Sequence, residues 1–190
     1  MRISKTTAVM SLAAFLATAC PLKAQAKNSQ DDENACRTFV QGFYGWYVSP
    51  PIRGGFPLED ALTNKRRAFS PELGRGLKEV LKAEARDREV WLTFDPVVNS
   101  QDPGDRYEVR KISFKGANCL AEVYGVWSSP VAARTSVKPN VVAELTIKNG
   151  HWCFVNFHYP DNEPPASENL VGMLKWIEEE LAKKTPVNHN

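Results

Sequence analysis

The stretch that decides the fold is residues 140–159, which read NVVAELTIKNGHWCFVNFHY. Two runs rich in β-branched and aromatic residues flank Asn149-Gly150. This dipeptide favours a two-residue hairpin turn because both of its positions adopt positive φ. The turn predicts two antiparallel strands with a fixed register. The pairs that it places on one face are Ile147 with Trp152 and Leu145 with Phe154.

The last of these strands, residues 151–159, is apolar on both faces. Alternation from the turn predicts a second face made of Val142, Cys153, Val155, Phe157 and Tyr159. A strand with two apolar faces indicates that both sides of the sheet are at least partly covered. The same apolarity allows a homodimer that pairs through the outer face of the sheet.

Two further strands are predicted upstream, over residues 106–115 and 119–128. Residues 129–139 then connect the second strand to the third. A hairpin connection of about ten residues exceeds the usual two to five, and loops held by a rigid sheet often carry binding sites. We therefore expect a partner-binding loop here. Its candidate residues are Ser129, Pro130, Arg134, Thr135, Ser136 and Lys138.

Apolar residues recur at three- and four-residue spacing in residues 35–48 and 71–88, which predicts two long helices. A shorter helix is expected over residues 58–68. Ser70-Pro71 is a typical helix start, and Lys78, Glu79, Lys82 and Glu84 form a charged face that we expect to be solvated. Ser167 is expected to cap a final helix that ends before Pro186.

These elements predict one α+β domain over residues 35–184, with helices packed on one curved, mainly antiparallel, cone-like sheet and a C-terminal helix. Residues 27–34 are expected to be a disordered N-terminus and residues 185–190 a tail. No repeat or low-complexity stretch interrupts the chain.

Residues 1–26 resemble a secretory signal peptide. They contain basic Arg2 and Lys5, an apolar run too short to span a bilayer, and the small-x-small site Ala24-Gln25-Ala26. Cleavage after Ala26 predicts a periplasmic protein. The alternative is lipidation at Cys20, because residues 17–20 loosely match a bacterial lipobox.

Cleavage after Ala26 would leave Cys36, Cys119 and Cys153 in a compartment where disulfides persist. At most one pair can form, and the sequence leaves the pairing open. No cysteine or histidine spacing indicates a metal site, and no cofactor motif is present.

The charge balance excludes one class of partner. The chain carries 24 basic and 22 acidic residues, and loss of residues 1–26 would leave it close to neutral. Nucleic-acid binding needs a concentrated basic face, so we expect no nucleic-acid partner.

Acid–base chemistry has few candidates. His158 is the best placed histidine, and Asp161 and Glu163 follow it in a loop. The strand acids are expected to face water: Glu108, Glu122 and Glu144. We therefore expect no catalytic residues. The tryptophans either line a pocket between the first helix and the sheet or fill a core. The candidate pocket residues are Phe43, Tyr47, Trp127 and Trp152.

Three stretches carry a family resemblance: the aromatic residues of the first helix, residues 94–102, and the strand Trp152-Cys153-Phe154 before Tyr159. Together they resemble a bacterial family of exported proteins of undefined function, within the cone-shaped superfamily named after nuclear transport factor 2. The resemblance covers residues 35–159 and implies a fold more than an activity. The long C-terminal helix departs from it.

The resemblance leaves three functions open, one of which is an enzyme that uses His158 or strand acids inside the cone. Exported small domains without catalytic groups resemble immunity proteins, which implies a periplasmic inhibitor that binds a cell-wall-degrading effector of type VI secretion through the loop at residues 129–139. The alternative is a small-molecule-binding cone of the cell envelope.

Overall fold

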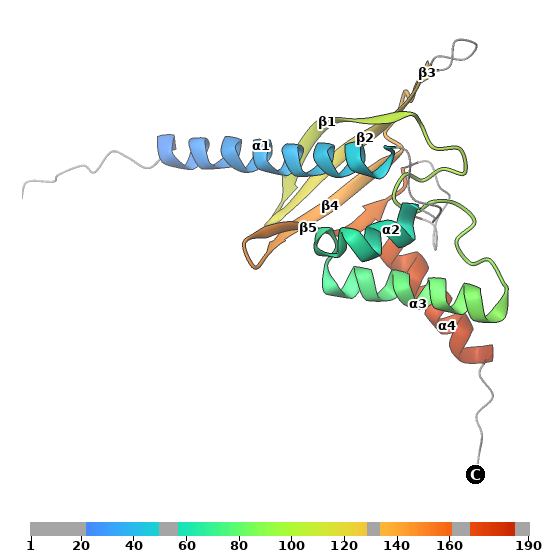
Figure 1. Ribbon diagram of the computed structural model, residues 1–190. Coiled ribbons are helices and arrows are strands. Elements are labelled where there is room, and N and C mark those ends of the chain that lie inside the picture. Colours follow the sequence, from blue (N-terminus) through green and yellow to red (C-terminus); the bar gives the residue numbers. More distant parts are fainter. Residues whose placement is uncertain (1–21, 50–56, 129–133, 161–167, 185–190) are drawn as a thin grey trace, which may run out of the picture.

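The computed structural model describes residues 22–49, 57–128, 134–160 and 168–184, with side chains described from Ser29 onward. Figure 1 shows helices and a curved antiparallel sheet, which confirms the expected α+β class with a C-terminal helix. The elements are α1 (Leu22–Tyr47), α2 (Pro57–Asn64), the 3-10 helix η1 (Arg66–Ala68), α3 (Pro71–Asp87), β1 (Arg106–Lys115), β2 (Asn118–Trp127), β3 (Arg134–Thr135), β4 (Val141–Lys148), β5 (His151–His158) and α4 (Leu170–Lys184).

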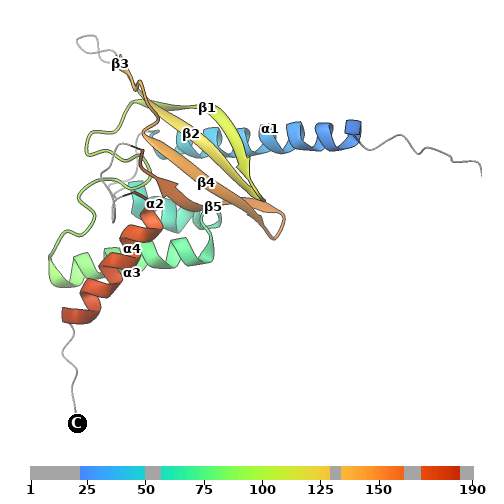
Figure 2. The same ribbon diagram turned by 180° about the vertical axis from the view of Figure 1, so that it is seen from behind.

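The strands run in the order β1-β2-β4-β5, and β3 pairs with the end of β2. The four predicted strands are confirmed to within one residue at each end. Helix α1 lies across one face of the sheet, and a disulfide between Cys36 and Cys119 joins it to β2. Figure 2 shows that α1 covers only one face, since the opposite face of β1, β2 and β4 carries no helix.

The edge strands β1 and β5 are both occupied by other parts of the chain. The side-chain amide of Gln41 on α1 donates to the carbonyl of Tyr107 (2.7 Å) and accepts from the N–H of Val109 (2.9 Å). At the β5 edge the N–H of Ser70 donates to the carbonyl of Phe154 (2.8 Å). These contacts satisfy backbone groups that an open edge would leave unpaired.

The register of the last hairpin is confirmed at its turn but changes further along. Ile147 faces Trp152 and Leu145 faces Phe154, as the Asn149-Gly150 turn predicts. An irregularity between Glu144 and Leu145 then shifts the pairing. The prediction that Phe157 and Tyr159 lie on the face opposite Phe154 is wrong for Phe157, because a bulge inserts one residue and turns the following side chains over. Phe157 is fully buried, with its ring centroid 5.0 Å from that of Phe154.

The helices differ from prediction at their ends. Helix α1 begins at Leu22 rather than residue 35, so residues 27–34, expected to be disordered, are helical, and the predicted cleavage site after Ala26 lies within α1. Residues 27–34 contain few strong helix formers, among them Lys27, Gln30 and Glu33, and no apolar periodicity that would reveal the helix. The segment 58–68 divides into α2 and η1.

Helix α3 has the predicted Ser70 cap, which accepts a hydrogen bond from the N–H of Leu73. Helix α4 is capped by the side chain of Asn169, which accepts from the N–H of Gly172 (2.9 Å); the predicted cap, Ser167, lies outside the described residues.

Aromatic rings fill the space between α1 and the sheet. Phe43 is 6% exposed and stacks on Tyr47 with ring centroids 5.5 Å apart. The same ring meets Phe154 edge-on at 4.8 Å and Phe69 at 5.7 Å. Helix α1 is therefore held by packed aromatic side chains as well as by the disulfide.

Candidate functional site

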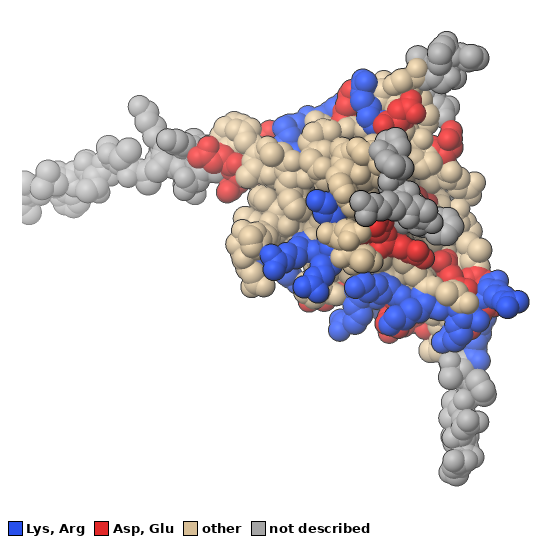
Figure 3. Space-filling view, viewed as in Figure 1, with Lys and Arg blue, Asp and Glu red and all other residues tan. Residues whose placement is uncertain are grey.

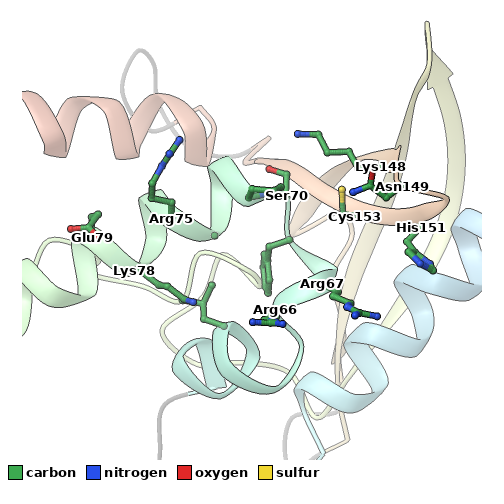
Figure 4. Close-up of a pocket in the computed structure, with 14 residues that line it drawn as sticks. Arg66, Arg67, Ser70, Arg75, Lys78, Glu79, Lys148, Asn149, His151 and Cys153 are labelled. Atoms are coloured by element: carbon green, nitrogen blue, oxygen red, sulfur yellow. The ribbon is translucent and has the colours of Figure 1, made fainter.

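A basic hollow lies where η1, the start of α3 and the β4–β5 turn meet (Figure 4). Its volume is about 620 Å³. Five of its lining residues are cations, contributed by η1, α3 and β4, and we call this set the basic pocket: Arg66, Arg67, Arg75, Lys78 and Lys148. The remaining polar residues on the lining include Ser70, Glu79, Asn149 and His151.

Local folding explains why these cations converge. The backbone of Phe69 and Ser70 pairs with β5 at Phe154, which sets the end of η1 beside the β4–β5 hairpin. Ala68 and Phe69 are buried, so the short 3-10 turn presents Arg66 and Arg67 to solvent. Figure 4 shows these two arginines on one side of the hollow and Lys148 across it.

Most of the positive charge in the basic pocket has no counter-charge. Lys148 forms a salt bridge with Glu72 (2.6 Å), and the one lining carboxylate, Glu79, binds Lys82 (2.8 Å). Within the described parts of the chain, the other four cations of the pocket form no salt bridge. Figure 3 shows the resulting concentration of Lys and Arg over η1 and α3.

The first turn of α3 adds to this potential. Ser70, Pro71 and Gly74 line the pocket, so the N-terminal end of a 17-residue helix borders it. The N-terminus of a helix carries a partial positive charge. The pocket is therefore electropositive from both its side chains and its backbone.

The lining residues that resemble nucleophiles are poorly suited to chemistry. Ser70 is 3% exposed and its hydroxyl accepts the helix-capping hydrogen bond. Cys153 is buried, and burial raises the pKa of its thiol, which disfavours the reactive thiolate. The cations around them are suited to holding an anion.

The Lys148–Glu72 salt bridge gives a testable pH effect. The hydrogen bond from Lys148 lowers the pKa of Glu72 from 4.5 to about 2. A lowered pKa in the folded state means that the pair stabilises the protein above the ordinary pKa and loses this contribution as the pH falls through about 2. We expect carboxyl carbon NMR to find Glu72 titrating near 2, and nearer 4.5 in K148Q. The K82Q variant, which removes another lysine of α3, should leave the pKa of Glu72 unchanged. The same Glu72 pKa in wild type and K148Q would refute the pairing.

The predicted partner-binding loop is only partly described, because Ser129 and Pro130 lie outside the described residues. Arg134 and Thr135 form the short strand β3, where only a loop was predicted. This strand pairs with the end of β2. The N–H of Ser136 donates to the carbonyl of Gly125 (3.0 Å), and its hydroxyl donates to Asn140 Oδ1 (2.6 Å). Lys138 follows Val137, whose side chain is 95% exposed.

The four predicted pocket residues do not gather in one place. Phe43 and Tyr47 are buried and stacked in the core. Trp127 ends β2, whereas Trp152 lies next to the β4–β5 turn at the other end of the sheet. Of the three cavities that we describe, only the smallest, about 240 Å³, is bordered by one of the four, Tyr47.

Tyr47 serves to hold a loop. Its hydroxyl donates to Asp95 Oδ2 (2.8 Å), and the hydroxyls of Tyr44 and Tyr159 donate to the backbone carbonyls of Val97 and Pro96. Burial raises the pKa of Asp95, and the hydrogen bond from Tyr47 opposes that rise. These tyrosines fix the connection between α3 and β1.

His158 lies beside an acid of the neighbouring strand. Its Nε2 lies 2.8 Å from Glu144 Oε2 on β4, while Asp161 and Glu163 lie outside the described residues. Burial opposes the ionisation of Glu144, but hydrogen bonds from His158 and Asn118 outweigh it and lower the Glu144 pKa. The pair lies on the face of the sheet that α1 does not cover.

The disulfide Cys36–Cys119 resolves the pairing that the sequence left open, and leaves Cys153 as a free thiol. The described residues contain no group of three or more metal-ligating side chains arranged around an ion. No helix in the same part of the chain is both long and apolar enough to cross a bilayer.

The basic pocket was not predicted from the sequence. The available signal was the run Lys65-Arg66-Arg67 three residues before the Ser70 cap, with Arg75 and Lys78 spaced three apart on the helix that follows. The charged face of this helix was expected to be solvated. Lys78 on that face is exposed, and it also lines the pocket.

Comparisons with known proteins give no assignment: no family model, curated protein or solved structure matches this chain.

Proposed function

We propose that this protein is a non-enzymatic binding protein that captures an acidic segment of a protein partner in the basic pocket. The observation that carries the proposal is the set of four cations without counter-charge around a hollow of about 620 Å³. Uncompensated positive charge in a concave surface focuses the field on an approaching anion and accelerates encounter.

The form of the pocket favours an extended anion over a single small ion. Arg66, Arg67, Arg75 and Lys78 are all exposed and come from two elements, so their charges are spread along the rim. A small anion is better held by convergent, buried donors. Guanidinium groups bind carboxylates through two parallel hydrogen bonds, which supports an acidic peptide segment as ligand.

The cell compartment belongs to the same proposal. We infer export to the periplasm, with lipidation at Cys20 as the alternative. The Cys36–Cys119 disulfide supports this, because disulfides persist mainly in oxidising compartments. The hypothesis of an immunity protein that inhibits a secreted cell-wall-degrading effector remains compatible with an acidic partner.

The hairpin around β3 is a second candidate contact for such an inhibitor. Hydrogen bonds hold Ser136 to the sheet, and Val137 projects 95% exposed beside it. Figure 1 shows β3 at one end of the sheet and the β4–β5 turn, next to the basic pocket, at the other. A partner that binds the pocket through a short segment need not reach the hairpin.

The pocket is tested by neutralising its arginines. A fluorescein-labelled hexaglutamate peptide should bind the wild-type protein, and R66Q/R67Q should weaken that binding by about tenfold, since two exposed ion pairs are each worth up to about 1 kcal/mol. Binding should also weaken with added salt, because exposed charges are screened. Fluorescence anisotropy measures both effects.

The matched control is K111Q/K115Q, which removes the same charge from β1. Lys111 pairs with Glu122 on the sheet and neither lysine lines the pocket. This variant should change the affinity less than twofold. Equal losses in the two double variants would show nonspecific attraction to net charge and would reject the proposal.

A further inference from the structure

A second hollow, of about 870 Å³, runs between α3 and α4. Its floor is apolar and includes Val80, Ala83 and Leu174, each less than 10% exposed. Val155 of β5 also lines it, and Val171 stands on its rim, 46% exposed. We call this hollow the interhelical groove.

The interhelical groove and the basic pocket lie on either side of one ridge of α3. Arg75 and Glu79, four residues apart and therefore on one helix face, line both. Glu72, on the groove side, binds Lys148 on the pocket side (2.6 Å). A partner segment that covers this ridge contacts both hollows.

The charges around the combined surface are strongly unequal. Eight Lys and Arg residues line the two hollows, against three glutamates. Lys148 and Lys82 pair with two of those glutamates, Glu72 and Glu79, and Arg86 pairs with Asp87. Among the described residues, this leaves five lining cations and one lining glutamate, Glu178, outside any salt bridge. The excess lies on the side of the basic pocket, because the groove itself is lined by four cations and the same three glutamates. An apolar groove beside a basic pocket is complementary to a segment that is apolar on one side and acidic on the other.

We propose that the interhelical groove binds an acidic amphipathic helix of the protein partner; this rests on the proposed function and names the form of its ligand. Two packed helices present a groove into which the side-chain ridge of a third helix fits. Helix α4 has 15 residues, so it spans about 22 Å and accommodates a ligand helix of about four turns. Apolar anchors at three- and four-residue spacing would contact the floor, while acidic residues beside them would reach the basic pocket.

The test uses a designed peptide as probe. The probe is an 18-residue fluorescein-labelled helix with leucine at helical spacing and glutamate on its other faces, compared with a shuffled peptide of the same composition and with hexaglutamate. The ordered peptide should bind about tenfold tighter than the shuffled one, because only the ordered peptide presents a continuous apolar stripe. The V171Q variant should bind the ordered peptide about five- to tenfold more weakly than the wild type, and its affinity for hexaglutamate should be unchanged.

The control variant V137Q makes the same substitution at a position 95% exposed beside β3, and should change neither affinity. Equal binding of the ordered and shuffled peptides, or of wild type and V171Q, would overturn the groove proposal even if R66Q/R67Q still weakens hexaglutamate. Loss of that hexaglutamate effect would instead reject the proposed function. The other occupant to test is a second copy of the chain, and sedimentation velocity tests for it. A wild-type dimer that dissociates in V171Q would show that a second copy fills the groove, which also overturns the proposal.

Discussion

Removal of the Cys36–Cys119 disulfide should lower the free energy of unfolding by about 4 kcal/mol. The bond closes a loop with a sequence separation of 83 residues, and closing a loop of that length removes entropy from the unfolded chain worth about 4.5 kcal/mol. It also fixes α1 to β2, and both of its cysteines are fully buried. Urea unfolding of C36A/C119A, followed by tryptophan fluorescence, measures the loss.

Two comparisons make this result specific. A reductant should destabilise the wild-type protein to the level of C36A/C119A and leave that variant unchanged. The C153A variant should lose no more than about 1 kcal/mol, because it removes one buried thiol without opening a loop. A double variant as stable as the wild type would contradict the assigned pairing.

The Phe43→Ala substitution should cost about 3–5 kcal/mol, the usual range for truncating a buried phenylalanine. Phe43 meets four other aromatic rings, from α1, the segment before α3, and β5, within 5.7 Å. The substitution therefore leaves a cavity that the surrounding rings cannot all close. Thermal or urea unfolding gives the value.

This variant also tests the alternative function of a cone that binds a small molecule. If Phe43 lined an open ligand pocket, its truncation would cost less than about 1 kcal/mol, because few packing contacts would be lost. The matched control is F114A on β1, where the ring is 42% exposed and the expected change is within about 0.5 kcal/mol. Equal effects in the two variants would support the open pocket.

Features fixed by neighbouring residues were predictable from the sequence. The Asn149-Gly150 turn sets its hairpin because Asn149 has φ of 52° and Gly150 of 76°, values that few other residues tolerate. The Ser70 cap and the apolar stripe of α3 identify that helix in the same way. The bulge beside Leu145 was not predictable, because it depends on how β5 meets the aromatic core after the turn, and the alternation pattern alone continues without interruption.

The candidate site was less predictable than the fold. Its cations come from segments separated by up to about 80 residues in the sequence, and each one alone is typical of a solvated surface. What brings them together is a backbone pairing between Phe69 and Phe154, which no sequence pattern marks. By contrast, the predicted aromatic pocket assumed that α1 and the sheet leave a space between them, and the rings of Phe43 and Phe154 occupy that space.

The decisive question is where the protein binds an acidic ligand. Titration of 15N-labelled protein with unlabelled hexaglutamate, followed by amide NMR, answers it residue by residue. We expect chemical shift changes centred on Arg66, Gly74 and Asn149, with little change at Ser136 or at buried Tyr47. Shifts confined to the β3 hairpin, or none at millimolar peptide, would contradict it.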